Sequence, residues 1–216
     1  LDARRMGFKV LSWTGGDQSG AANTADKLLH EPFDDPEALE KFTQLVNVAT
    51  VEFENLPKSM LEEVEQRIPL YPNSQAVSIC QHREKEKIFL SKNGFSCANF
   101  RIAEDLNSFI NGLSEIKTDA IVKTAEFGYD GKGQTVINSI TKDLHIEKND
   151  YILEKRIELK TEVSVITVRY QDNSLFSYKP IENIHKDQIL NHSKIPADIN
   201  KEIFTKAQSN AKLISE

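Results

Sequence analysis

The sequence predicts a protein of mixed α/β and α+β class, and two observations support this class. In the first part of the chain, apolar strand-like runs at residues 8–13 and 46–53 each precede a helical pattern. Such alternation favours a parallel sheet. After residue 150, β-branched and aromatic residues become frequent, which is typical of paired strands.

The first part is expected to contain two helices before a break in the pattern. The second helix opens at Pro57, where the missing N–H of proline costs nothing. The pattern breaks around residues 71–74, at Pro69 and Pro72, and a further helix begins near Gln81 and stops at Gly94. We therefore expect a domain boundary at this break. The helices are expected over residues 36–45, 57–68 and 81–94.

After the helix over 81–94, the second part is expected to contain one more helix and to continue mainly as strands. A glycine-rich loop joins two short strands, and the turn at residues 171–174 joins two later ones. The helix is expected over residues 103–113, and the strands over residues 120–123, 134–137, 151–154, 161–170 and 175–180.

The composition excludes several classes of protein. The chain has 216 residues, 39% of them hydrophobic, which is enough for one or two domains with hydrophobic cores. Its 27 Lys and Arg against 33 Asp and Glu form no basic stripe, so we expect no nucleic-acid partner. It has no run of about eighteen apolar residues, so we expect no membrane partner. Cys80 and Cys97 are isolated, as in a protein of the reducing cytoplasm.

Both ends of the sequence have helical patterns that stop abruptly. Residues 1–6 look like the last turns of a helix before a glycine cap at Gly7. From Asp198, apolar residues recur at helical spacing up to Glu216, with no cap after them. We expect both ends to be cut inside a larger architecture.

The glycine-rich loop carries the clearest chemical signal. Gly128, Gly131 and Gly133 let the backbone approach a ligand closely and turn its N–H groups inward, as a polyphosphate requires. Lys123 and Lys132 add positive charge. The loop is not a Walker A sequence, because a strand follows it rather than a helix. A plain hairpin whose glycines only satisfy turn geometry is the alternative.

Several motifs in one order resemble a known family. With the glycine loop, they are Thr-Val-Glu-Phe-Glu-Asn at 50–55, Gln-His-Arg at 81–83 followed by Glu-Lys at 86–87, Glu-Lys-Arg-Ile at 154–157 and Pro-Ile-Glu-Asn-Ile-His at 180–185. They are similar to those of the 5-(carboxyamino)imidazole ribonucleotide synthetases, ATP-grasp ligases of purine biosynthesis. The resemblance covers nearly the whole chain.

The resemblance implies an ATP-grasp fold preceded by a Rossmann-like domain. Residues 1–76 would form that N-terminal domain without its first strand, and residues 77–216 the ATP-grasp domain, with a lid over about 98–153. The implied reaction consumes ATP, bicarbonate and aminoimidazole ribonucleotide. Bicarbonate becomes carboxyphosphate, which then carboxylates the amine of the ribonucleotide. A cytoplasmic homodimer is implied.

The resemblance also assigns roles to residues. Arg83 and Lys123 would contact the ATP phosphates, the loop would close over them, and the segment from Glu154 would read the adenine edge largely through backbone groups. Glu162 would accept hydrogen bonds from the ribose, although it could instead face solvent. Arg83 could likewise belong to a charged helix face. The implied ATP-binding residues are Arg83, Lys123, Gly128, Tyr129, Asp130, Gly131, Lys132, Gly133, Gln134, Glu154, Lys155, Arg156, Ile157, Glu162 and His185.

Glu52, Glu54 and Asn55 are assigned to the aminoimidazole substrate. The two glutamates alternate on an expected strand and so share one face close to the strand end, where α/β proteins place ligands.

The sequence departs from the family pattern at a few positions. His82 stands where the family usually has Asp, and Ala125-Glu126 where a basic residue is common. The family's glycine-rich stretch is expected before Leu1 and its Mg²⁺ ligands beyond Glu216, so this chain alone is not expected to turn over. A catalytically inactive nucleotide-binding module and another carboxylating ATP-grasp ligase, such as a biotin-carboxylase relative, are the alternative functions.

Overall fold

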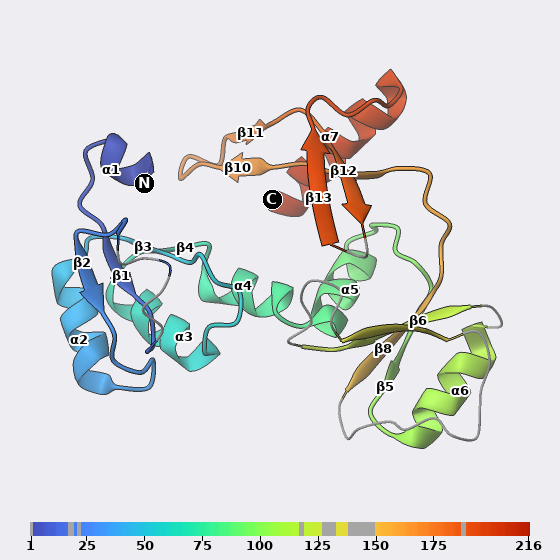
Figure 1. Cartoon of the computed structure of the whole chain (residues 1–216), viewed down its shortest axis with the longest axis horizontal. Coiled ribbons are helices and arrows are strands. Elements are labelled where there is room, and N and C mark those ends of the chain that lie inside the picture. The colour runs from blue at the N-terminus through green and yellow to red at the C-terminus, as the bar shows by residue number, and fades with distance from the viewer. Residues whose placement is uncertain are drawn as a thin grey trace. The chain divides into compact units, whose positions relative to one another are not determined.

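The computed structural model describes residues 2–16, 20, 23–116, 119–126, 133–137, 150–186 and 189–216. The chain divides into two compact units, Leu1–Gln81 and His82–Glu216, which we call unit 1 and unit 2 (Figure 1). No helix among these residues is both long enough and apolar enough to cross a membrane.

The described residues of unit 1 form two pairs of short parallel strands and four helices. Strand β1 (Leu11–Trp13) pairs with β2 (Lys27–Leu29), and β3 (Ala49–Thr50) pairs with β4 (Leu70–Tyr71). Both pairs are parallel, as the alternating pattern predicts, but the two expected strands, over residues 8–13 and 46–53, lie in separate pairs and not in one sheet. The helices are α1 (Asp2–Arg5), α2 (Pro36–Leu45), α3 (Lys58–Arg67) and α4 (Ser74–Cys80).

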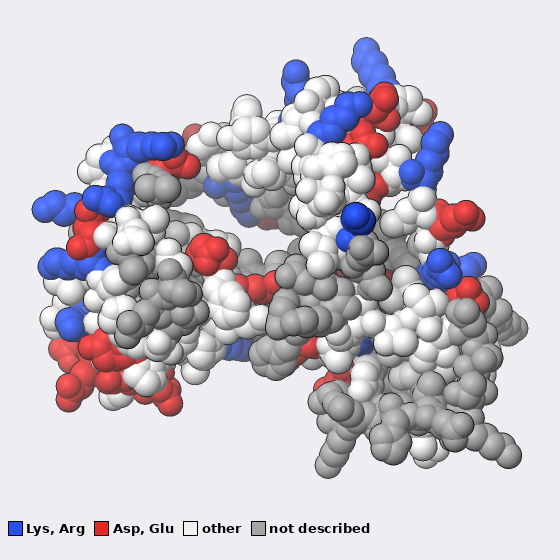
Figure 2. Space-filling view, viewed as in Figure 1, with Lys and Arg blue, Asp and Glu red and all other residues white. Residues whose placement is uncertain are grey.

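Helix α2 begins where the sequence dictates. The Asp35 side chain accepts hydrogen bonds from the backbone N–H groups of Glu37 and Ala38, and Pro36 occupies the first turn. Figure 2 shows acidic side chains gathered over α2. Glu37 in the first turn stabilises the helix, because its negative charge interacts with the positive end of the helix dipole. Helices α2 and α3 supply the core of unit 1, in which Leu39, Leu61 and Val64 are buried and Trp13 packs at the edge.

Unit 2 begins with helix α5 (Arg83–Lys92) and a four-stranded antiparallel sheet of order β5-β8-β6-β7. Helix α6 (Leu106–Ile116) lies against one face of this sheet (Figure 1) and buries Phe109 and Leu113 against Val122 and Leu153. The strands are β5 (Phe100–Ala103), β6 (Ala120–Thr124), β7 (Gln134–Ile137) and β8 (Tyr151–Lys155).

The rest of unit 2 contains two smaller sheets and the last helix. One sheet has the order β13-β12-β9, the other pairs β10 with β11, and all their pairings are antiparallel. Their strands are β9 (Glu162–Ser164), β10 (Thr167–Arg169), β11 (Leu175–Ser177), β12 (Ile181–Lys186) and β13 (Ile189–Lys194), and helix α7 (Lys201–Ser215) follows.

Several expected elements were wrong in detail. The expected strand over 161–170 is two strands in different sheets, because its first residues pair with β12 and its later residues pair with β11. The expected helix over 103–113 begins only at Leu106, because residues 100–103 pair with β8. The expected strand over 46–53 is reduced to β3. Helix α4 and strands β2, β4, β5, β12 and β13 were not predicted.

Candidate functional site

A buried carboxylate lies between two lysines on the sheet of unit 2. The Nζ atom of Lys87 lies 3.0 Å from Oε2 of Glu154, and the Nζ atom of Lys123 lies 3.1 Å from Oε1 of Glu154. Only 9% of the Glu154 side chain is exposed, against 16% for Lys87 and 24% for Lys123. We call these three residues the lysine–glutamate cluster.

Strand register explains why the cluster forms. Lys123 on β6 is paired with Ile152 on β8, and Ile121 is paired with Glu154, so Lys123 and Glu154 are diagonal neighbours on one face of the sheet. Phe100 on β5 is also paired with Glu154. Side chains alternate between the faces of a strand, so Val122 and Leu153 point to the opposite face, where α6 covers them.

The charge state of Glu154 follows from two opposing effects. Burial by itself raises the pKa of the carboxyl, but the adjacent Lys123 and Lys87 outweigh it and hold the pKa below its ordinary value. Glu154 is therefore ionised at neutral pH. Within the cluster, two ammonium groups then face one carboxylate. Glu86 on α5 adds a second carboxyl, whose pKa burial raises, and Arg83 beside it adds a third cation, so three cations face two carboxyls and a surplus of one positive charge remains.

Arg83 anchors the start of helix α5 to the end of β6. Its backbone N–H donates to the carbonyl of Ala125 at 2.9 Å, and its guanidinium Nη1 donates to the carbonyl of Thr124 at 2.6 Å. Beside it, the Nε2 atom of His82 lies 3.9 Å from Oε1 of Glu126. The two departures from the family pattern thus face each other at the root of the expected flap.

The described part of the flap is held against β6. Thr124 donates its backbone N–H to the carbonyl of Gly133 at 2.8 Å, and Gln134 is paired with Lys123. Gly133 has φ +73°, a conformation that favours glycine. The remaining flap residues of the expected site lie outside the described residues: Gly128, Tyr129, Asp130, Gly131 and Lys132.

The segment after Glu154 leaves the sheet at Lys155. The backbone N–H of Lys155 donates to the carbonyl of Asn99, and that of Arg156 donates to the carbonyl of Asp119. Ile157 is exposed. The Nη1 atom of Arg156 also lies 3.5 Å from Oδ2 of Asp119, so this segment is held by backbone contacts and one ion pair, while Ile157 remains accessible to a ligand.

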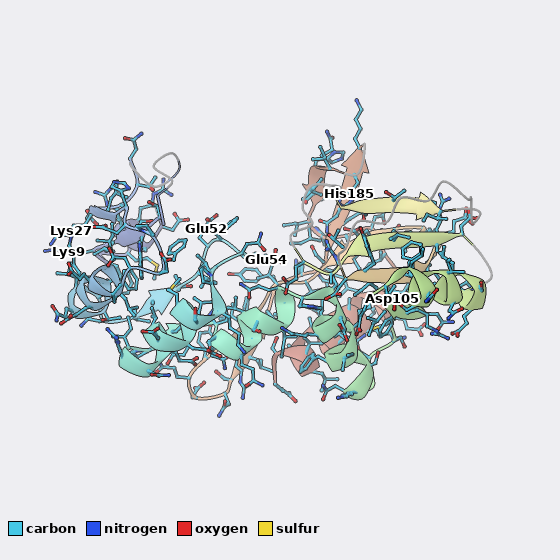
Figure 3. The ribbon with its side chains drawn as sticks, turned by 90° about the horizontal axis from the view of Figure 1, so that it is seen from below. Lys9, Lys27, Glu52, Glu54, Asp105 and His185 are labelled. Atoms are coloured by element: carbon cyan, nitrogen blue, oxygen red, sulfur yellow. The ribbon has the colours of Figure 1, made fainter. Side chains whose placement is uncertain are left out.

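Glu162 and His185 are brought together by the pairing of β9 with β12. The Nε2 atom of His185 lies 3.7 Å from Oε1 of Glu162, and Nδ2 of Asn183 donates to the same oxygen at 3.4 Å. His185, labelled in Figure 3, is on β12. The two residues that were expected in the nucleotide site thus form one polar pair.

The expected substrate residues lie on an exposed loop of unit 1. Strand β3 ends at Thr50, so Glu52 and Glu54 do not lie on a strand and the expected shared face is wrong (Figure 3). Gln81 contacts this loop: its side-chain amide donates to the carbonyls of Glu54 and Leu56. Asn55 lies between these two carbonyls and is partly buried.

The sequence assigned no role to Lys87. It lies four residues after Arg83, so the two share a face of α5, but in sequence the stretch reads as a solvated charged helix. Its distant partner Glu154 becomes apparent only once the sheet has formed.

The described residues contain no group of three or more His, Cys, Asp or Glu side chains that could hold a metal ion. They do not by themselves fit Mg²⁺, and we assign no step to the metal here.

Comparisons with known proteins agree with this architecture. Residues 1–81 match the protein family of the ribonucleotide synthetase preATP-grasp domain, and residues 88–216 match the family of the ATP-grasp domain. These matches confirm the expected fold class.

The chain is also similar to individual proteins along almost its whole length. It is 32% identical to the N5-carboxyaminoimidazole ribonucleotide synthase of Brucella melitensis, over 98% of this chain and 60% of the relative. The enzyme of the same name from Bacillus subtilis is 32% identical over 96% of this chain and 56% of the relative. The chain thus spans less than two thirds of the length of these curated relatives.

A solved structure gives the same result. An N5-carboxyaminoimidazole ribonucleotide synthetase in complex with ADP superposes with a TM-score of 0.90 at 30% identity, over 99% of this chain and 58% of that one. The resemblance expected from the sequence motifs is confirmed.

Proposed function

The chain belongs to the ATP-grasp family, and we propose that it forms the nucleotide-binding part of an N5-carboxyaminoimidazole ribonucleotide synthetase. The proposed substrates are ATP, bicarbonate and aminoimidazole ribonucleotide. The names of the relatives that match both units support this substrate set, as does the ADP bound to the similar solved structure.

The proposed reaction has two steps. An oxygen of bicarbonate attacks the terminal phosphorus of ATP, and ADP leaves, forming carboxyphosphate. The amine nitrogen of aminoimidazole ribonucleotide then attacks the carboxyphosphate carbon, and phosphate leaves. Phosphoryl transfer of this kind depends on positioning and charge neutralisation more than on covalent chemistry from the protein.

The observation that carries the proposal is the lysine–glutamate cluster. Its surplus positive charge lies where β6 ends and next to Gln134, the first strand residue after the glycine-rich loop. A polyphosphate that reached Lys123 would neutralise this surplus in a site where water is partly excluded, and ion pairing is stronger there than in bulk water. The exposed segment after Glu154 would bind the adenine edge. The Glu162–His185 pair would bind the ribose, with Glu162 accepting hydrogen bonds from its hydroxyl groups.

Further properties are part of the same proposal. We assign the nucleotide-binding lid to residues of about 98–153. The loop with Glu52, Glu54 and Asn55 would bind the aminoimidazole substrate. The reaction would require Mg²⁺, because this ion binds the phosphates of ATP. A homodimer in the cytoplasm is the assembly that we propose.

Two measurements test the proposed function. Isothermal titration calorimetry with ATP and ADP tests nucleotide binding by the chain, and a complete absence of binding would overturn the proposal. Release of ADP from ATP and bicarbonate by the complete gene product is then measured with and without aminoimidazole ribonucleotide. We expect release to depend on this substrate. Release that is independent of it would indicate another ATP-grasp ligase, and binding without release would indicate an inactive nucleotide-binding module.

A further inference from the structure

Lys87 has no part in the proposed nucleotide contacts, yet it is held firmly in the cluster. Its ammonium forms an ion pair with Glu154 at 3.0 Å and lies 5.9 Å from the centroid of the Phe100 ring. Phe100 is the strand partner of Glu154, so both contacts lie on the same patch of the sheet. An aromatic face attracts a nearby cation, and removing one partner of a buried ion pair is strongly unfavourable because the other charge is left unpaired.

The two lysines of the cluster differ in what they can do. Lys87 is the less exposed of the two and has both the Phe100 ring and Glu154 as neighbours. Lys123 is more exposed and lies opposite Gln134, at the root of the glycine-rich loop. Lys87 is therefore suited to be the permanent counter-ion of Glu154, and Lys123 is suited to engage a ligand.

We propose that Lys87 is a positioning residue of the nucleotide site, which neutralises Glu154 so that Lys123 keeps its charge available for the phosphates. This inference rests on the proposed binding of ATP. Without Lys87, Lys123 is the ion-pair partner that Glu154 retains among the described residues. A phosphate that drew Lys123 away would then leave a buried carboxylate unpaired, which is strongly unfavourable. The positive surplus that attracts the phosphate would be lost as well.

A double-mutant cycle tests the inference. The affinity for ATP is measured by calorimetry for the wild type, Lys87→Met, Glu154→Gln and the double variant. Lys87→Met should raise the dissociation constant about tenfold or more when Glu154 is present, and less than about threefold in the Glu154→Gln background. Lys87→Arg, which keeps the charge, should bind ATP nearly as the wild type does.

Controls separate positioning from folding. Lys85→Met changes an exposed lysine of the same helix and should leave the affinity for ATP unchanged. Adenosine, which has no phosphate, should bind the wild type and Lys87→Met equally well. A merely structural role for Lys87 would affect adenosine and ATP alike.

The outcomes are distinguishable. If the wild type does not bind ATP, the proposed function itself fails. If the wild type binds ATP and Lys87→Met binds it equally well, or if Lys87→Met weakens ATP binding as much in the Glu154→Gln background as in the wild type, the inference is overturned. If Lys87→Met alone does not fold, the comparison of the double variant with Glu154→Gln still decides: a large difference in affinity contradicts the proposal.

Discussion

The side-chain amide of Gln81 donates hydrogen bonds to the backbone carbonyl of Glu54 at 2.6 Å and to that of Leu56 at 2.8 Å. Two sequence motifs of unit 1, Glu-Phe-Glu-Asn at 52–55 and the glutamine that begins Gln-His-Arg, are thus joined directly. Because the loop with Glu54 has no regular strand pairing, Gln81 satisfies backbone oxygens that a strand neighbour would otherwise satisfy.

Replacing Gln81 should therefore destabilise unit 1. In Gln81→Ala, the carbonyl of Leu56 loses the Gln81 donor and that of Glu54 keeps only the backbone N–H of Leu56, so we expect the free energy of unfolding to fall by about 1 kcal/mol. Trp13 is the only tryptophan of the sequence and packs against the core of unit 1, so its fluorescence during urea unfolding reports this change. Gln75→Ala, on the exposed side of α4, serves as the control. A midpoint equal to that of the wild type would show that the two hydrogen bonds contribute nothing.

Lys123 is expected to be the main phosphate contact of the described residues. Lys123→Met should weaken ATP binding by well over about 1 kcal/mol, or roughly tenfold, because a charge-assisted hydrogen bond to phosphate is lost. Calorimetric titration measures the effect, with Lys92→Met at the exposed end of α5 as the matched control. An unchanged dissociation constant for Lys123→Met would refute this assignment.

The stability contribution of Glu154 should depend on pH in a defined direction. The lysines hold its pKa in the folded protein below the ordinary 4.5, so its contribution is fully present above about pH 5 and is lost as the pH falls through the lowered pKa. We expect Glu154→Gln to lower the free energy of unfolding by about 3 kcal/mol at pH 7, because two ammonium groups lose their partner. The difference from the wild type should shrink as the pH falls below 4.5.

Urea unfolding followed by circular dichroism at several pH values measures this dependence. Glu158→Gln changes an exposed carboxylate a few residues later and should have little effect at any pH. A constant difference between Glu154→Gln and the wild type down to pH values well below 4.5 would contradict the assignment.

Gly112 allows α6 to approach the sheet. A Cβ atom at this position would lie 2.6 Å from Cδ1 of the buried Leu153 and 3.1 Å from Cβ of Arg101. Although alanine is favoured over glycine in a helix by about 1 kcal/mol, we expect Gly112→Ala to destabilise unit 2 by about 1–3 kcal/mol through this overlap. Asn111→Ala on the exposed face of α6 is the control.

A second variant tests the cause of that loss. In the Leu153→Ala background the added methyl group has room, so Gly112→Ala should cost much less there than in the wild type. Circular dichroism during urea unfolding measures both differences. Equal costs in the two backgrounds would show that the overlap with Leu153 is not responsible.

Local patterns in the sequence predicted much of the fold. Pro36, its preceding Asp35 and the apolar spacing that follows place α2 correctly, because capping and periodicity act within a few residues. The strand over 134–137 was predicted from the glycine-rich loop before it, which fits a hairpin-like connection to residues 120–123. The strand run over 161–170 was misjudged, because β propensity does not say with which neighbour a residue pairs.

The candidate site was predictable only in part. The order of the motifs indicated the family and named Lys123, Glu154, Glu162 and His185. It did not show that Lys123 and Glu154 form an ion pair, that Glu162 faces His185, or that Glu52 and Glu54 lie on a loop.

The sequence by itself determined elements such as α2, because capping residues and apolar spacing act within a few residues. It also determined the family, because the family motifs follow one another in a fixed order. Only the tertiary structure decided the role of Lys87. In sequence it is one charge of the exposed-looking run Arg-Glu-Lys-Glu-Lys. Once β8 pairs with β5 and β6, the buried Glu154 carboxylate lies 3.0 Å from the Lys87 ammonium of α5, and this contact makes Lys87 its counter-ion.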